Sequence, residues 1–95
     1  MNMQEFDVSK YLDDEEIITE YLKSALEEND TQFFMQALGN VAKARGMTQI
    51  SKDTGLGRAS LYKAVSGNNQ PKLATVNKIL HAVGLSLTVE KTAST

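Results

Sequence analysis

The sequence has no cysteine, no tryptophan and a single proline among its 95 residues. Without cysteine, the chain can form neither a disulfide nor a thiolate-ligated zinc site, and it has no cysteine nucleophile. It also lacks an apolar run near the roughly 18 residues of a membrane span, and its start shows no basic-then-apolar signal pattern. We therefore expect a soluble, cytoplasmic protein that does not bind membranes.

Residues for catalysis are scarce as well. The single histidine, His81, has no cysteine and no evident acid paired with it, and Gly55, Gly57 and Gly67 have the spacing of turns and caps, not of a phosphate-binding loop. The acids from Asp13 to Glu16 are consecutive at a helix start, so they point in different directions and favour helix capping over a cation site. We expect no enzymatic activity, no cofactor and no metal.

Charge is divided unevenly along the chain. Residues 1–30 hold ten acids and two bases, a formal charge of −8, whereas residues 31–95 hold eight bases and two acids, a formal charge of +6. Such asymmetry indicates two surfaces: a basic one for a polyanion, and an acidic one for a basic protein or simply for solvent. The chain is short enough to form one domain, with an acidic segment at 1–30, a helical bundle at 31–84 and a tail at 85–95.

Apolar spacing predicts an all-α bundle of about five helices. The first is an acidic helix that begins after Asp13 or Asp14 and buries a stripe of Ile17, Tyr21, Leu22, Ala25 and Leu26. The second runs from the break at Asn29-Asp30 to Gly46, with an inner face made of Phe34, Leu38, Val41 and Ala42 and with Phe33 and Ala37 beside it.

Three shorter helices and a strand are expected to follow. Thr48 is a good cap for a helix over 49–54, Gly55 provides a turn, and a fourth helix covers 58–66. A fifth helix starts near Pro71, buries Leu73, Val76, Ile79, Leu80 and Val83, and ends at Gly84. In the tail, Leu85, Leu87 and Val89 alternate with polar residues, which predicts a short C-terminal β-strand. Its partner could be the stretch around Phe6 and Val8, a second subunit or another protein.

The segment Met47–Ser66 predicts a helix-turn-helix that binds duplex DNA. Gly55 permits the tight corner, Ser51 is small where the helices cross, and Ile50, Leu56, Leu61 and Val65 have the spacing to pack the pair onto the bundle. The residues left on the outer face of the second helix are Arg58, Ala59, Ser60, Tyr62 and Lys63.

A recognition helix contacts base edges with its N-terminal residues, so we predict base contacts from Arg58, Ala59, Ser60 and Lys63. Arg58 can donate two hydrogen bonds to guanine, and Lys63 can reach a base or a phosphate. The predicted phosphate contacts are Thr48, Gln49, Tyr62, Asn68, Asn69 and Lys72. Tyr62 has a second interpretation, in which it only covers the helix surface.

These motifs resemble a known class. Thr48-Gln49, Gly55-Leu56, the run from Arg58 to Tyr62 and the loop from Gly67 to Pro71 are similar to the lambda-repressor/Cro (XRE) class of helix-turn-helix proteins. The segments Phe6–Asp13 and Tyr21–Glu27 resemble, more narrowly, the leading part of HigA-type addiction-module antidotes, and Thr88-Val89 fall in that family's C-terminal strand. Ser51 and Gly57 depart from the class, which more often has Ala and Ser or Thr there.

The resemblance implies an antitoxin of a type II toxin–antitoxin module. Such a protein neutralises a small basic toxin of the RelE/HigB kind by direct binding and represses its own promoter as a homodimer. Charge complementarity then makes the acidic segment the predicted toxin-facing surface, with candidates Asp13, Asp14, Glu15, Glu16 and Glu20. Two alternatives stay open: a prophage-type XRE transcriptional regulator without a toxin, and a protein-interaction module that has lost DNA binding.

Overall fold

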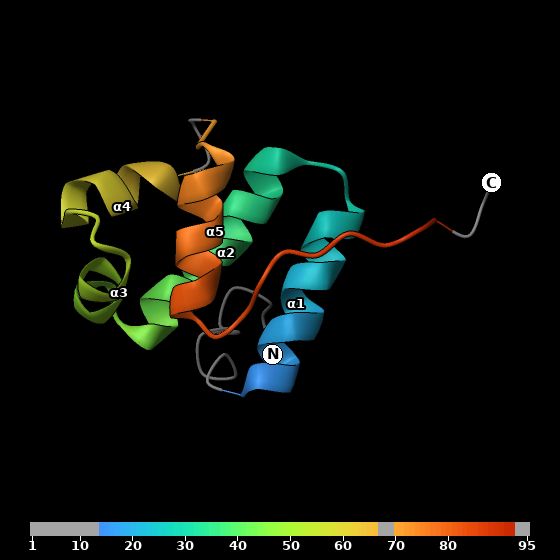
Figure 1. Ribbon diagram of the computed structural model, residues 1–95, viewed down its shortest axis with the longest axis horizontal. Helices are drawn as coiled ribbons and strands as arrows, with labels where there is room; N and C mark the ends of the chain where they lie inside the picture. Colours follow the sequence, from blue (N-terminus) through green and yellow to red (C-terminus); the bar gives the residue numbers. More distant parts are fainter. Residues whose placement is uncertain (1–13, 67–69, 93–95) are drawn as a thin grey trace, which may run out of the picture.

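The computed structural model describes residues 14–66 and 70–92, and the elements in this part of the chain are five α-helices. They are α1 (Glu15–Glu27), α2 (Thr31–Arg45), α3 (Met47–Thr54), α4 (Arg58–Ala64) and α5 (Leu73–Ala82). Figure 1 shows α2 and α5 in the middle, with α1 on one side and the α3–α4 pair on the other. Across the described residues, no helix is long and apolar enough to cross a membrane.

Helix α1 is stabilised at its start by Asp14. The Asp14 carboxylate accepts hydrogen bonds from the backbone N–H groups of Glu16 (2.8 Å) and Ile17 (3.3 Å), which confirms the predicted cap. The predicted apolar stripe is wrong by one residue at its beginning. Ile18 is fully buried with Leu22 and Ala25, whereas Ile17 is 43% exposed and Leu26, at the far end, is 50% exposed.

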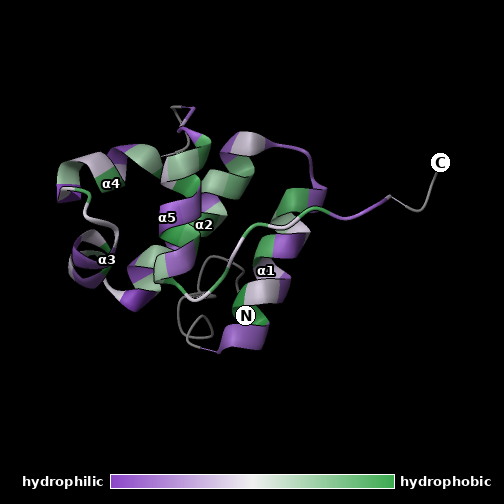
Figure 2. Ribbon diagram, in the orientation of Figure 1, coloured by the Kyte–Doolittle hydropathy of each residue, from purple (hydrophilic) through white to green (hydrophobic). Residues whose placement is uncertain are grey.

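Helix α2 is the central element and contributes the largest share of the core. It buries Phe34, Met35, Ala37, Leu38, Gly39, Val41 and Ala42, and the Asp30 carboxylate caps it by accepting from the backbone N–H of Phe33 (3.1 Å). Phe33 itself is 47% exposed, so it does not join the inner face. Figure 2 shows hydrophobic residues gathered where the helices face one another.

The junction between α2 and α3 differs from the prediction. Gly46, at φ 103°, ends α2 and serves as the first cap of α3, so α3 begins at the buried Met47 and Thr48 lies exposed inside its first turn. Thr48 is therefore not the cap of this helix. The reason is Gly46, whose positive φ lets the chain turn sharply between two helices without an intervening linker.

Helix α5 begins at Leu73, with Lys72 as its cap residue, and Pro71 precedes it. Ile79, Leu80 and Val83 are buried as predicted, but Leu73 is 71% exposed and lies on the surface. The helix ends at Ala82, and Gly84, two residues further, has a φ of 85°.

The tail does not form the predicted strand. Residues 85–92 are extended and irregular, and in the view of Figure 1 the tail passes in front of α1. The backbone N–H of Leu85 donates to the carbonyl of Leu80 (2.8 Å), and beyond it no strand pairing exists within the described residues. A strand needs a neighbour to satisfy its backbone groups. One predicted neighbour, the stretch around Phe6 and Val8, lies outside the described residues.

Candidate nucleic-acid interface

The turn between α3 and α4 is fixed by four hydrogen bonds that involve side-chain and backbone groups. Gly55, in the left-handed region at φ 77°, donates its N–H to the Ser51 carbonyl (3.0 Å). The hydroxyl of Thr54 is buried, donates to the Ile50 carbonyl (2.8 Å) and accepts from the N–H of Leu56 (3.2 Å). The Ser51 hydroxyl donates to the Leu56 carbonyl. The corner therefore holds α3 and α4 in one arrangement.

The inner side of this pair packs as predicted. Ile50 and Leu61 are essentially fully buried, Val65 is also buried, and Leu56 is half-buried against the core. Val65 meets α2 very closely, because a Cβ placed on Gly39 would lie 3.0 Å from the Val65 Cβ. A glycine in α2 thus permits the end of α4 to contact the central helix.

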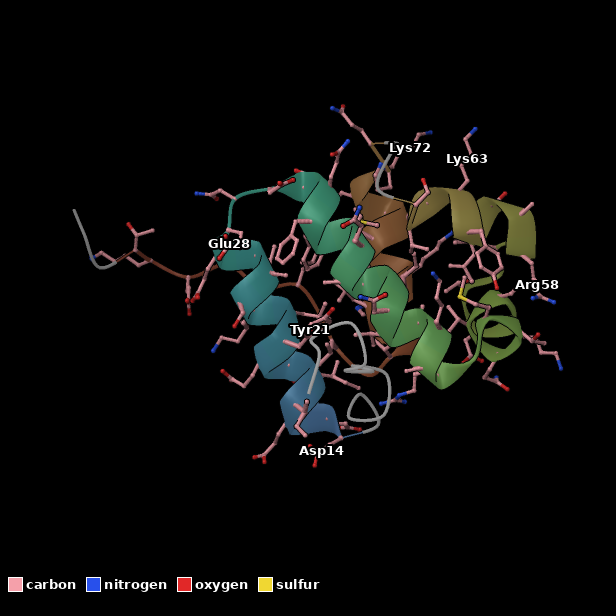
Figure 3. All side chains as sticks on the ribbon, turned by 180° about the vertical axis from the view of Figure 1, so that it is seen from behind. Asp14, Tyr21, Glu28, Arg58, Lys63 and Lys72 are labelled. Carbon is pink, nitrogen blue, oxygen red and sulfur yellow. The ribbon has the colours of Figure 1, made fainter. Side chains whose placement is uncertain are left out.

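The outer side of α4 presents the predicted base-contacting residues. Arg58, Ala59, Ser60 and Lys63 are all exposed. Arg58 is the first residue of the helix, and Figure 3 shows Arg58 and Lys63 extending away from the body of the protein. The guanidinium carbon of Arg58 lies 5.9 Å from the centre of the Tyr62 ring, at the outer limit of a cation–π contact. The structure therefore places Arg58 over Tyr62, an interaction that helical spacing in the sequence did not predict.

The predicted phosphate-contacting residues are less uniform. Thr48 and Gln49 are exposed in the first turn of α3, which has no side-chain cap. The Gln49 amide donates to the Asp53 carboxylate (2.8 Å), so an acid that was not among the candidates lies on the same helix face. Its i, i+4 spacing from Gln49 is the signal that could have revealed it. Lys72 is exposed before α5, and Asn68 and Asn69 lie outside the described residues.

The predicted toxin-facing residues lie on a different part of the molecule. Glu15, Glu16 and Glu20 are exposed on the first half of α1, Asp14 caps that helix, and Asp13 lies outside the described residues. Glu20 lies 3.9 Å from Lys23, a contact between two highly exposed side chains that contributes little stability. In Figure 1, α1 and α4 are on opposite sides of α2 and α5, so the acidic and basic candidate surfaces are separate.

Neither catalysis nor metal binding gains support from the described residues. Where side chains are placed, no group of three or more His, Asp or Glu residues is arranged to hold a metal ion. His81 is exposed on α5. The arrangement that stands out chemically is the pair of short helices with Arg58 and Lys63 on its outer face.

Comparison with known proteins gives a consistent result over almost the whole chain. The family model described as "Probable addiction module antidote protein" matches residues 2–91. An uncharacterized protein of Haemophilus influenzae is 42% identical over 89 residues, which cover 94% of this chain and 92% of that relative. No solved structure matches the chain.

Proposed function

Because this chain belongs to the family of probable addiction module antidote proteins, we propose that it is the DNA-binding antitoxin of a type II toxin–antitoxin module. In this proposal it binds a basic toxin of the RelE/HigB kind directly, represses its own promoter, and acts in the cytoplasm as a homodimer. Antidotes act by binding, so the proposal assigns the protein no catalytic step.

One observation supports DNA binding above the others. The exposed face of α4 carries Arg58 at its N-terminal end and Lys63 further along, while the opposite face is buried in the core. In this proposal α3, the tight turn and α4 act as a helix-turn-helix of the XRE class, in which the second helix enters the major groove. The surrounding segment is basic: residues 43–66 hold five bases and one acid.

Each residue has a proposed role. Arg58 donates two hydrogen bonds to guanine O6 and N7, a contact worth about 1–3 kcal/mol of discrimination against another base. Lys63 contacts a base or a phosphate, and Ala59 and Ser60 lie against base edges. Thr48 and Gln49 lie on the uncapped first turn of α3, where free backbone N–H groups favour a phosphate oxygen. Tyr62, Asn68, Asn69 and Lys72 complete the proposed phosphate contacts.

We propose a homodimer because of the way in which recognition helices bind DNA. One recognition helix contacts only a few base pairs, whereas two helices in half-sites about 34 Å apart multiply the specificity. The proposal therefore expects a promoter site with twofold symmetry.

Binding to the chain's own upstream promoter, measured at several salt concentrations, tests the DNA half of the proposal. Wild type should bind tightly, and its affinity should fall steeply as salt rises, because phosphate contacts release counterions. The Arg58→Ala, Lys63→Ala variant should bind about 10- to 100-fold more weakly, since it loses a base-specific contact and a second cation.

A matched variant controls for net charge. Lys23→Ala, Lys91→Ala also removes two cations, both from exposed positions away from α4, and should bind the promoter within about threefold of wild type once salt is physiological. Equal losses in both variants would mean that only net charge matters. Absence of salt-dependent binding by wild type would instead favour a protein-interaction module without DNA binding.

Toxin binding distinguishes the proposed antitoxin from the nearest alternative function. A prophage-type XRE regulator would show the same promoter binding and the same loss in the Arg58→Ala, Lys63→Ala variant. Only an antitoxin would also form a stable complex with a small basic protein encoded beside it and suppress that protein's toxicity. Co-expression of the two proteins, scored by growth and by co-purification, decides between the two functions.

A further inference from the structure

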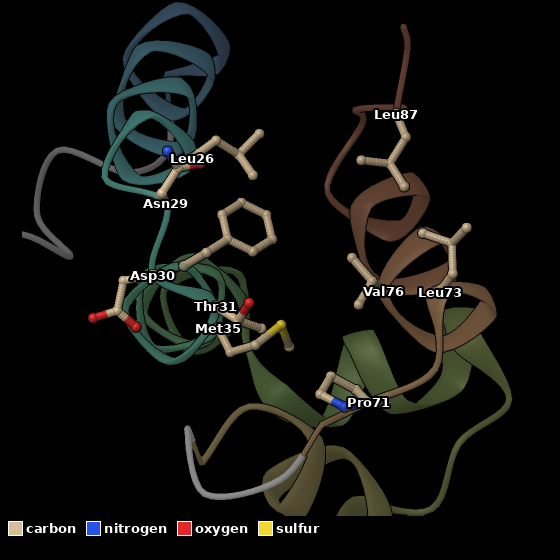
Figure 4. Close-up of a pocket in the computed structure, with 10 residues that line it drawn as sticks. Leu26, Asn29, Asp30, Thr31, Met35, Pro71, Leu73, Val76 and Leu87 are labelled. Atoms are coloured by element: carbon tan, nitrogen blue, oxygen red, sulfur yellow. The ribbon is translucent and has the colours of Figure 1, made fainter.

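An apolar groove lies away from Arg58, which begins α4, and close to Pro71, which follows the loop after α4. It has a volume of about 310 Å³ and runs between the α1–α2 connection and the start of α5, with Phe34 and Met35 buried at its base. Figure 4 shows Leu26 on one side facing Leu87 and Val76 on the other, with Pro71 at one end. Of the predicted toxin-facing residues that the structure describes, none lines this groove.

Several of the large apolar side chains around the groove are exposed to solvent. Leu73 is 71% exposed, Leu26 50% and Leu87 39%, and two residues further along the tail Val89 is 95% exposed. Single exposed apolar residues are normal on a protein surface, but a contiguous group beside a groove marks an interaction site.

The tail gives the groove a second property. Residues 86–92 are extended, and within the described residues their backbone groups form no strand pairing. An open extended edge beside an apolar groove can accept an added strand, with main-chain hydrogen bonds to the edge and alternate side chains in the groove. The alternation of Leu85, Leu87 and Val89 matches that mode of binding.

Charge indicates the kind of partner. Glu27, Glu28 and Asp30 are exposed beside Leu26, and residues 14–31 as a whole hold seven acids and one base. Lys72 is the one base beside the opposite rim, between Pro71 and Leu73. A second copy of this chain would bring its own acidic α1 toward this rim and be repelled, whereas a basic partner would be attracted.

We propose that this groove and the adjoining tail edge bind an extended, apolar segment of a basic protein, with lysines or arginines on the side that faces Glu27, Glu28 and Asp30. This inference rests on the proposed function, because it identifies the basic partner with the toxin, and it moves the contact from the first half of α1 to its end. Arg58, at the N-terminal end of α4, lies away from the groove, whereas Lys72, a proposed phosphate contact, lies at its rim between Pro71 and Leu73.

The experiment measures binding of the full chain to the small basic protein encoded beside it, by titration calorimetry. Leu87→Asp, Val89→Asp places two charges in the exposed apolar edge and should weaken binding by at least about tenfold, as loss of a buried apolar anchor does. Promoter binding by this variant should equal that of wild type, which shows that the bundle is folded.

Backbone pairing is tested separately. Thr88→Pro, Val89→Pro removes neighbouring N–H groups that point to opposite edges of the extended tail, so strand addition on either edge is weakened. Its matched control is Thr88→Ala, Val89→Ala, which loses the same side chains but keeps both N–H groups. The proline pair should bind more weakly than the alanine pair, and equal affinities would exclude an added strand.

Charge reversal at two places on α1 decides the location. Glu27→Lys, Glu28→Lys at the groove should weaken binding by about tenfold or more, and Glu16→Lys, Glu20→Lys, the same charge change on the first half of the helix, should alter it by no more than about threefold. The reverse order would overturn the groove proposal and leave the antitoxin function intact.

Two other results would also overturn it. If Leu87→Asp, Val89→Asp lowers the sedimentation mass of the protein alone, the groove binds a second copy and not a basic partner. If wild type does not bind the neighbouring basic protein, the groove proposal and the proposed binding of a toxin both fail. The proposed promoter binding is tested independently, by the Arg58→Ala, Lys63→Ala variant.

Discussion

The two ends of this molecule are stabilised in different ways. At the acidic end, Asp14 and Asp30 cap α1 and α2 with side-chain hydrogen bonds. At the basic end, the N-cap residues of α3 and α4 are Gly46 and Gly57, and neither helix has a side-chain cap hydrogen bond. Helices of eight and seven residues are too short to be stable alone, so packing and the turn between them must hold them in place. The basic end therefore depends on its neighbours more than the acidic end does.

The largest expected loss of stability comes from a substitution at Gly39 that pushes α4 away from α2. A Cβ on Gly39 would lie 3.0 Å from the Val65 Cβ and 3.2 Å from the Val65 carbonyl oxygen, so Gly39→Leu has no room without a backbone shift. Overpacking of this kind costs about 1–3 kcal/mol, and we expect the upper part of that range. Urea unfolding followed by circular dichroism measures the loss, and promoter binding should weaken in parallel.

Gly57→Ala is the matched control for Gly39→Leu. Gly57 has a negative φ, is exposed, and has no atom within 4 Å of an added Cβ. This variant should stay within about 0.5 kcal/mol of wild type, as surface substitutions usually do. Unchanged stability in Gly39→Leu would show that α4 does not depend on its contact with α2.

A smaller effect is expected inside the turn that joins α3 to α4. Thr54→Val keeps the side-chain shape but leaves the N–H of Leu56 without the hydroxyl that accepts it. An unsatisfied group in a buried place costs about 1–3 kcal/mol, and here the Leu56 side is only part-buried, so we expect about 1–2 kcal/mol. Thr48→Val makes the same chemical change at an exposed position of α3 and should leave the urea midpoint unchanged. Equal midpoints for both variants would contradict a structural role for Thr54.

Much of the difference between the acidic and basic ends could be predicted from the sequence, because helix caps and turns depend on the chemistry of single residues. Asp14 and Asp30 are caps by their chemistry, and Gly55 and Gly84 take the positive φ that a turn or helix end requires. The inner residues of the α3–α4 pair follow helical spacing, and the structure buries them.

The rest depends on contacts that spacing cannot show. Ile17 and Ile18 are adjacent and both apolar, so periodicity alone did not choose between them, and packing against α2 selected Ile18. Leu73 fits the helical pattern of α5 but lies at its first residue, beyond the reach of the core. The tail alternates as a strand does, yet within the described part of the chain no neighbour pairs with it, and pattern alone does not supply one.

The smallest expected change in stability comes from giving α4 a side-chain cap of the kind that α1 has. Gly57 has φ −67° and ψ 155°, which serine adopts without strain, and a serine hydroxyl there can accept a first-turn N–H of α4. Gly57→Ser should stabilise the protein by a few tenths of a kcal/mol, or a rise of about 1–3 °C in Tm for a chain of this size. Asp14→Ala, which removes the existing cap of α1, should lower stability by about 1 kcal/mol and calibrates the measurement. If Gly57→Ser raises Tm but weakens promoter binding, the bare backbone at Gly57 is used in close approach to DNA; a lower Tm would mean that α4 does not accept a serine cap at all.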